Sequence, residues 1–302
     1  MKKFDLALAY TWEYDEDFVL RVKELLSTTN LTTLLISYHN LEEVVENFCK
    51  GLYEIRFFLD RASDVEEDFE VLARLMEEKK VFIFNKYSFA KLANDKATMH
   101  LEFITHGINT PYTIIISPYR EKENIELNLE QLAKLGRPFI IKPANTTGGG
   151  IGVVKGAETL ADVLKARKDL ENDKYLLQQK ILPVEKDGKR FWFRCFYTFE
   201  KIINCWWNDL THVYEILTIE EKNYYNLSEI DKIVLKIHEI TKLDFFSTEI
   251  ALTHENKFVV IDYVNDQCDM RFKSKHPDGV PDEVVDKIIN ALGDFIAKRV
   301  NC

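Results

Sequence analysis

Apolar and polar positions divide the first 85 residues into strands and helices that follow one another in turn. Apolar runs at 4–10, 31–37, 55–59 and 81–84 have the length and composition of buried strands. Apolar residues at helical spacing predict helices over 15–27, 40–51 and 64–79, the first with its inward face formed by Phe18, Leu20, Val22, Leu25 and Leu26. Strands that alternate with helices predict a parallel sheet flanked by helices. We therefore expect an N-terminal α/β domain over residues 1–85.

The pattern changes after residue 85. A helix over 94–106, with Asn94 as its N-cap, leads to an apolar strand that ends near Lys142 and then to strands over 176–181, 190–199 and 201–207. A helix over 228–242, with Ser228 and Asp231 as a capping pair, precedes two further strands, and an amphipathic helix over 281–299 follows them. We interpret 86–175 as a central α+β lobe and 176–302 as a C-terminal lobe.

A glycine-rich loop follows Lys142. Glycine occupies positions 148, 149, 150 and 152, so the backbone there can adopt positive φ and present N–H groups to an anion. The loop matches neither G-x-x-x-x-G-K-[ST] nor the dinucleotide fingerprint, and the β-branched residues after it predict a second strand rather than a helix. The pattern favours a phosphate held under a hairpin with Lys142 as a point charge. A glycine-rich surface turn is the alternative.

Two carboxylates lie on a second predicted hairpin. If 248–253 pairs with 258–263, with Thr253 opposite Phe258, then Glu249 faces Asp262 with Cβ atoms roughly 5 Å apart. Such a pair inside apolar strands is destabilising unless a cation or a proton intervenes. Oxygen ligands without Cys or His suit Mg²⁺, and Asn265 joins them if the strand ends or bends before it. An exposed sheet face with two carboxylates by chance is the alternative.

Taken in order, these motifs resemble the ATP-grasp superfamily, in particular its carboxylate–amine ligases, over roughly residues 85–300. The resemblance rests on Asp95-Lys96, Gly107 to Pro111, Lys142-Pro143 with the glycine loop, 178–181, Arg194, and Glu249 with Asp262 and Asn265. It implies a pre-ATP-grasp α/β domain followed by a two-lobed α+β ATP-grasp module. One departure is Trp192, at a position where many relatives carry an acidic residue. Another is the segment after Asn265, which lacks the usual Pro-Gly.

The resemblance implies a role for each candidate residue. Lys96 and Lys142 would contact the ATP phosphates together with loop residues Thr147, Gly148, Gly149 and Gly150. The adenine would be bound through backbone groups of Gln179, Lys180, Ile181 and Leu182, and the ribose by Glu185. Arg194 would lie near the transferred phosphoryl group, and the Mg²⁺ ligands would be Glu249, Asp262 and Asn265.

The implied reaction is Mg²⁺-dependent ligation. ATP would activate a carboxylate as an acyl phosphate, which an amine then attacks. The alternatives are a small-molecule kinase of this fold, acting for example on a polyol or inositol phosphate, and a nucleotide-binding module without turnover.

Three cations follow the predicted metal ligands on alternate positions, namely Arg271, Lys273 and Lys275. In an extended segment they would point to one side, so we predict a small-molecule acceptor that carries a carboxylate or a phosphate. Arg271 would act as a catalytic residue that grips this group through two hydrogen bonds. A solvated loop is the alternative. Cys268, in the same segment, is interpreted as a passive thiol rather than a nucleophile.

Composition excludes several classes of partner. A net charge of -10 argues against nucleic acid, whose binding is driven by phosphate neutralisation. No apolar run approaches the ~20 residues of a membrane helix, and the N-terminus lacks the apolar core of a signal peptide, so we expect a cytoplasmic protein without a membrane partner. The five cysteines form no C-x-x-C pair and predict neither a disulfide framework nor zinc. The resemblance implies that the chain can form a homodimer.

Overall fold

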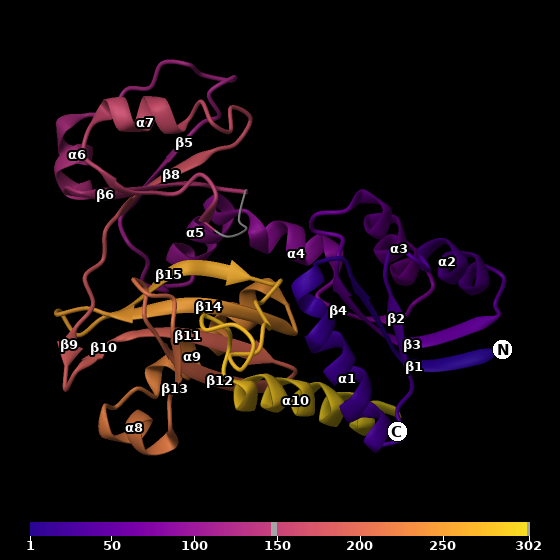
Figure 1. The fold of residues 1–302 in the computed structure, drawn as a ribbon. Coiled ribbons are helices and arrows are strands. Elements are labelled where there is room, and N and C mark those ends of the chain that lie inside the picture. The colour runs from indigo at the N-terminus through magenta and orange to yellow at the C-terminus, as the bar shows by residue number, and fades with distance from the viewer. Residues whose placement is uncertain (146–149, 301–302) are drawn as a thin grey trace. The chain divides into compact units, whose positions relative to one another are not determined.

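The computed structural model describes residues 1–145 and 150–300, which form two compact units (Figure 1). The first unit contains residues 1–91, 194–247 and 266–302, and the second contains 92–193 and 248–265. Each unit therefore combines segments that are distant in the sequence. The division into three consecutive domains stays a prediction. Thr147, Gly148 and Gly149 lie outside the described residues.

The first unit begins with a parallel sheet. Its strand order is β2 (Thr33–Ile36), β1 (Lys2–Tyr10), β3 (Tyr53–Arg61) and β4 (Phe82–Phe84), with every pairing parallel. The connections carry the short helix η1 (Glu13–Asp15) and the helices α1 (Glu16–Thr28), α2 (Leu41–Cys49) and α3 (Glu67–Glu78). This arrangement confirms the predicted parallel sheet flanked by helices, because parallel strands need such crossovers.

Helices pack on the parallel sheet through apolar faces. Val44 and Phe48 of α2 join Phe69, Leu72 and Met76 of α3 in one core with the sheet. In α1 the buried residues are Phe18, Val19, Val22 and Leu26. The prediction for Leu20 was wrong, since its side chain is 49% exposed. Two residues after Phe18 a helix has turned by about 200°, so Leu20 faces away from the core.

The rest of the first unit is built from later segments. It contains β12 (Lys201–Trp207), β13 (Tyr214–Ile216), α8 (Ile219–Tyr224), α9 (Glu229–Thr241) and α10 (Asp282–Val300). The predicted cap of α9 was wrong, because the side chain of Ser228 makes no capping hydrogen bond. Asp231 instead accepts hydrogen bonds from Asn204 and Lys222.

The second unit contains an antiparallel sheet. The order is β5 (Thr113–Ile116), β8 (Tyr175–Gln179), β6 (Phe139–Pro143) and β7 (Val154–Ala157). Two helices, α6 (Leu129–Leu135) and α7 (Leu160–Ala166), share its apolar core. The glycine-rich segment therefore joins two neighbouring antiparallel strands, β6 and β7, as predicted.

Two helices precede this sheet, α4 (Tyr87–Asn94) and α5 (Lys96–Thr105). The sequence pattern missed α4 and placed the cap of α5 on Asn94. The cap is Asp95, whose carboxylate accepts a hydrogen bond from the N–H of Ala97 at 3.0 Å. The predicted helix thus begins two residues later, with Lys96 in its first turn.

A five-stranded sheet has the order β13, β12, β11 (Trp192–Thr198), β14 (Phe245–Leu252) and β15 (Phe258–Asn265). A short hairpin of β9 (Glu185–Lys186) and β10 (Lys189–Arg190) precedes β11. Among the described residues, no helix is both long and apolar enough to cross a membrane.

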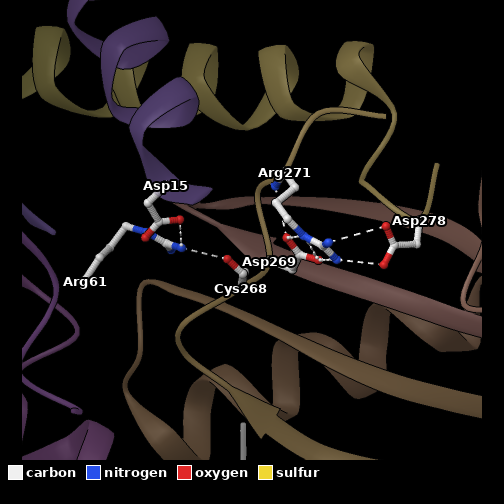
Figure 2. A network of polar contacts seen from close by, with 6 residues as sticks. All are labelled: Asp15, Arg61, Cys268, Asp269, Arg271 and Asp278. Carbon is white, nitrogen blue, oxygen red and sulfur yellow. Dashed lines mark hydrogen bonds and ion pairs between the residues drawn. The ribbon is translucent and has the colours of Figure 1, made fainter. Parts of the chain in front are cut away.

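A buried ion pair connects three segments of the first unit (Figure 2). The Arg61 guanidinium at the end of β3 donates to both carboxylate oxygens of Asp15, over 2.8 and 2.7 Å, and to the carbonyl oxygen of Cys268 over 2.9 Å. Both side chains of the pair are at most 3% exposed. The pair therefore fixes residues near 268 against the carboxyl end of the parallel sheet.

Replacing Arg61 with Met leaves the Asp15 carboxylate buried without its partner. We expect a loss of about 3–5 kcal/mol in the free energy of unfolding, measured by urea denaturation. The matched control is Arg21→Met, which removes the half-exposed pair with Asp286 and should cost no more than about 1 kcal/mol. The double variant Arg61→Met, Asp15→Leu should recover much of the loss. Equal losses for the two single variants would contradict this assignment.

Candidate functional site

Lys142 is the centre of a polar cluster in the second unit. Lys142 lies near the end of β6 and is only 7% exposed. Its Nζ donates a hydrogen bond to the carbonyl oxygen of Ile261 at 3.0 Å. The ammonium also lies 5.1 Å from the centre of the Tyr263 ring, within the range of a cation–π contact. The lysine is therefore held against β15, next to Asp262.

The pKa of Lys142 is shifted by its surroundings. Burial lowers the pKa of Lys142 from 10.5 to about 8; the carboxylates of Asp262 and Glu249 act in the opposite direction, and Lys96 adds to the lowering. Two lysines and two carboxylates therefore lie within electrostatic range of one another. All four were named from the sequence, which had no means of showing that β6, α5 and the hairpin meet.

Lys96 reaches this cluster from the first turn of α5. Asp95 caps the helix and also accepts a hydrogen bond from the Thr98 hydroxyl at 2.8 Å. The backbone N–H of Lys96 donates to the carbonyl oxygen of Ala144 at 3.0 Å. The start of α5 is thereby joined to the chain two residues beyond Lys142, and Lys96 is itself only 7% exposed.

A neutral hydrogen-bond network supports Lys142, and sequence reasoning missed it. The Tyr263 hydroxyl lies 2.6 Å from Nδ1 of His100 and accepts from the Gln178 amide at 3.0 Å. Burial first, and then Lys142, lowers the pKa of His100 to about 4. The imidazole is therefore neutral near pH 7 and shares one hydrogen bond, through Nδ1, with the Tyr263 hydroxyl. His100 and Tyr263 are 163 residues apart, so no local signal could have linked them.

The hairpin that carries the carboxylates closes one residue earlier than predicted. The N–H of Thr253 donates to the carbonyl oxygen of Lys257 at 2.9 Å, and Asn256 has φ of 58°. The predicted pair of Thr253 with Phe258 was therefore wrong. The Thr248 hydroxyl donates to the Asp262 carbonyl oxygen at 2.9 Å, so Thr248 lies beside Asp262, and the predicted pairing of Glu249 with Asp262 stays a prediction. The turn has a left-handed residue that alternation of apolar positions does not reveal.

Glu249 has a partner from another strand. The indole Nε1 of Trp192 donates to its Oε2 at 2.9 Å. Trp192 is 7% exposed, whereas Glu249, Asp262 and Asn265 are each half-buried. The sequence singled out Trp192 as a departure from the ATP-grasp pattern without assigning it a contact.

The donor set determines which ion could bind. Within residues 1–145 and 150–300 no group of three or more His, Cys, Asp or Glu side chains is placed to hold a metal. Glu249 on β14 and Asp262 on β15 supply two carboxylates. Asn265 is the last residue of β15, so the predicted end of the strand before Asn265 was wrong, and its place among the ligands stays a prediction. A set of one or two carboxylates with neutral oxygens fits Mg²⁺, which keeps waters and substrate phosphates as its other ligands, and does not fit zinc.

The described part of the glycine loop has the conformation that glycine permits. Gly150 and Gly152 have φ of 75° and 73°. A Cβ on Gly152 would also lie 3.3 Å from a ring carbon of Pro143. Gly152 is thus required both by its dihedral angle and by the close approach of the loop to the residue after Lys142.

The segment predicted to bind adenine leaves the sheet after β8. Gln179 still donates its N–H to Tyr112, whereas 180–182 runs outside any strand with the Leu182 side chain 62% exposed. Glu185, predicted for the ribose, forms an ion pair with Arg190 across the β9–β10 hairpin. The roles of Gln179, Lys180, Ile181, Leu182 and Glu185 stay predictions.

Arg194 and Arg271 belong to the first unit. The guanidinium of Arg194 lies 5.1 Å from the centre of the Trp207 ring. Arg271 donates to both oxygens of Asp269 and to Asp278, so two carboxylates engage its guanidinium (Figure 2). The phosphoryl-transfer role predicted for Arg194 stays a prediction.

The extended segment assumed for the three cations was wrong. Residues 273–275 form a turn in which the N–H groups of Lys275 and His276 both donate to the carbonyl oxygen of Phe272. The Lys273 ammonium donates to the carbonyl oxygen of Tyr214, and Lys275 pairs with Asp17. Because each cation has an internal partner, the segment does not present three charges on one side. The predicted contact of Arg271 with the acceptor substrate stays a prediction, and the extended segment on which it was based is not present.

Cys268 has the character of a passive thiol, as interpreted from the sequence. The residue is fully buried, and burial raises the pKa of its thiol to about 12. A thiol protonated at pH 7 is a poor nucleophile.

No known protein-family model matches the chain. A stretch of 147 residues is 28% identical to phosphatidylethanolamine N-methyltransferase of Clavispora lusitaniae. It covers 44% of this chain and only 17% of that protein.

Solved structures resemble the chain over nearly its whole length. D-alanine–D-alanine ligase from Bacillus anthracis, complexed with ATP, has a TM-score of 0.64 at 14% identity and covers 99% of this chain and 97% of its own. A RimK domain ATP-grasp protein from Sphaerobacter thermophilus has a TM-score of 0.63 at 17% identity, with 96% and 99% covered. Macrocyclase MdnC from Microcystis aeruginosa, bound with precursor peptide MdnA, has 0.65 at 10%, with 97% and 99% covered. The chain has the ATP-grasp fold, as predicted.

The shifted pKa of Lys142 predicts how stability depends on pH. Between about pH 8 and 10.5 the unfolded chain holds a proton on this lysine that the folded chain has lost. The wild type should therefore gain stability with rising pH relative to Lys142→Met, by up to about 3 kcal/mol across this window. Below pH 8 the difference between the two proteins should be constant. Parallel stability curves from pH 7.5 to 10.5 would contradict the assignment.

Proposed function

We propose that this protein is an Mg²⁺- and ATP-dependent ligase that activates a carboxylate as an acyl phosphate for attack by an amine. The observation that carries the proposal is the cluster around Lys142, in which two buried lysines lie in electrostatic range of two carboxylates on the ATP-grasp fold. The D-alanine–D-alanine ligase of this fold was solved with ATP, and its name describes ligation.

The charges of the cluster favour a metal–polyphosphate pair. Lys96 and Lys142 carry two positive charges, and Glu249 and Asp262 carry two negative ones, so the four groups together are neutral. A polyphosphate alone would be repelled by the carboxylates, and a cation alone would be repelled by the lysines. A ligand that brings both signs together satisfies both pairs, and Mg²⁺-bound ATP is such a ligand.

The residues of this chain would bind and orient the reacting groups. Lys142 and Lys96 would hold the phosphates, with Thr147, Gly148, Gly149 and Gly150 donating backbone N–H groups to them. The backbone of 179–182 would bind adenine, Glu185 the ribose, and Arg194 the transferred phosphoryl group. Glu249, Asp262 and Asn265 would hold Mg²⁺, which when bound neutralises charge on the phosphates. No protein nucleophile is required.

An anionic small-molecule acceptor remains part of the proposal. Because Asp269 and Asp278 already engage Arg271, its contact with the acceptor would require an exchange of partners. The acceptor screen therefore includes amino acids and peptides for the ligase, and phosphorylated polyols for the alternative kinase.

An isotope experiment distinguishes ligase from kinase. Candidate carboxylates labelled with ¹⁸O are incubated with ATP, Mg²⁺ and amines, and ADP release is followed. A ligase should transfer one ¹⁸O atom from the carboxylate to inorganic phosphate, because attack of the amine on an acyl phosphate expels that oxygen with the phosphate. A kinase should instead give a product heavier by one phosphoryl group. Absence of ADP release with every acceptor, despite nucleotide binding, would favour a binding module and overturn the proposal.

Replacing Lys142 with Ala should weaken binding of ADP and of the ATP analogue AMPPNP at least tenfold, because the phosphates lose a charge-assisted hydrogen bond of about 1.5–3 kcal/mol. Adenosine, which has no phosphate, should bind the variant and the wild type equally. The control is Lys155→Ala, which removes an exposed lysine from β7 of the same sheet. Titration calorimetry measures all three ligands. Equal weakening of adenosine and ADP would place Lys142 outside the phosphate site.

A further inference from the structure

We propose that Trp192 is a positioning residue for metal binding, and that its indole N–H holds the Glu249 carboxylate in the orientation that receives Mg²⁺. The inference rests on the proposed function and adds to it a residue that acts through Glu249. It begins with a single contact, the 2.9 Å hydrogen bond from Nε1 of Trp192 to Oε2 of Glu249.

The contact is made by a side chain that has little freedom to move. Trp192 is the first residue of β11, is 7% exposed, and lies in the same compact unit as Glu249. The two residues are separated by 57 positions, so the bond depends on the tertiary fold. A buried indole ring loses little further entropy when its N–H is aimed at a fixed acceptor, and it can therefore orient a longer, half-buried side chain such as Glu249.

The chemistry of the donor suits a metal site. Indole donates one hydrogen bond and accepts none, so it can donate to the carboxylate but cannot itself act as a metal ligand. It is also neutral. A lysine or arginine at position 192 would neutralise Glu249 and compete with the metal, whereas the indole stabilises the carboxylate and leaves its negative charge in place.

The residue type at 192 also changes the charge of the site. An acidic residue at position 192 would place another carboxylate beside Glu249. With Trp192 the cluster has two carboxylates, balanced by Lys96 and Lys142. Its affinity for Mg²⁺ then depends on how well Glu249 is oriented and on the phosphates that accompany the ion.

The test measures AMPPNP binding to the full chain by calorimetry across a series of Mg²⁺ concentrations, and again with the metal chelated. In Trp192→Phe the ring remains and the N–H is lost. The Mg²⁺ concentration for half-maximal binding should rise by roughly 10–100-fold, the usual effect of removing a partner of a metal ligand. The affinity for AMPPNP without metal should be unchanged, because the lysines that hold the phosphates are untouched.

The matched control is Trp206→Phe. Trp206 is also buried, and its Nε1 donates to Oε2 of Glu221 at 3.2 Å, in the first unit. Removing this bond should leave the Mg²⁺ dependence unchanged. If both variants shift the Mg²⁺ dependence alike, or neither does, the inference is overturned. A wild type that binds AMPPNP equally well with and without Mg²⁺ would instead overturn the proposed metal site.

A second variant tests the same hydrogen bond if Trp192→Phe fails to fold. Replacing Trp192 with 3-benzothienylalanine keeps the two-ring shape and substitutes sulfur for the N–H. It should reproduce the shift in Mg²⁺ dependence with an unchanged unfolding midpoint. An isostere that binds Mg²⁺ and AMPPNP like the wild type would show that ring packing, and not the hydrogen bond, is what matters at this position.

Discussion

The burial of one ammonium group, on Lys142, is the constraint on which the second unit depends. A cation removed from water is unfavourable unless carbonyl groups, an aromatic face or anions surround it. Here Ile261 supplies the carbonyl oxygen, Tyr263 the ring and the carboxylates of Asp262 and Glu249 the opposite charge. Satisfying Lys142 therefore brings β6 of the antiparallel sheet to β15 of another sheet, and the candidate site is formed where they meet.

Neutral groups support the charged ones in this site. His100, kept uncharged by burial and by Lys142, shares a hydrogen bond with the Tyr263 hydroxyl, and Gln178 donates to the same oxygen. Trp192, which is also neutral, donates a hydrogen bond to the Glu249 carboxylate. Since none of these side chains carries a charge at neutral pH, they fix the positions of the lysine and the carboxylates without cancelling the charges that a metal and a polyphosphate would need.

In the first unit, residues 266–278 are held by ion pairs. Arg61 joins Asp15 to the carbonyl oxygen of Cys268, and Arg271 is shared by Asp269 and Asp278. The cations that an extended chain would offer to a substrate are thus used to hold residues 266–278 in an irregular path. A loop without regular secondary structure needs such contacts, because it has few backbone hydrogen bonds of its own.

The sequence by itself determined the alternation of strands and helices in the first domain, the lysine before the glycine loop and the hairpin with two carboxylates. These features can be predicted from periodicity and residue type because each depends on residues that are close together in the sequence. It did not determine the cap of α5, the closing residues of the hairpin, or the partners of Arg271, Lys273 and Lys275. A cap or turn changes with a single left-handed residue such as Asn256, and a charge takes whichever partner folding brings near. Only the tertiary structure decided that Trp192 meets Glu249 and that His100 meets Tyr263, since hydrogen bonds between residues 57 and 163 positions apart leave no periodic trace in the chain.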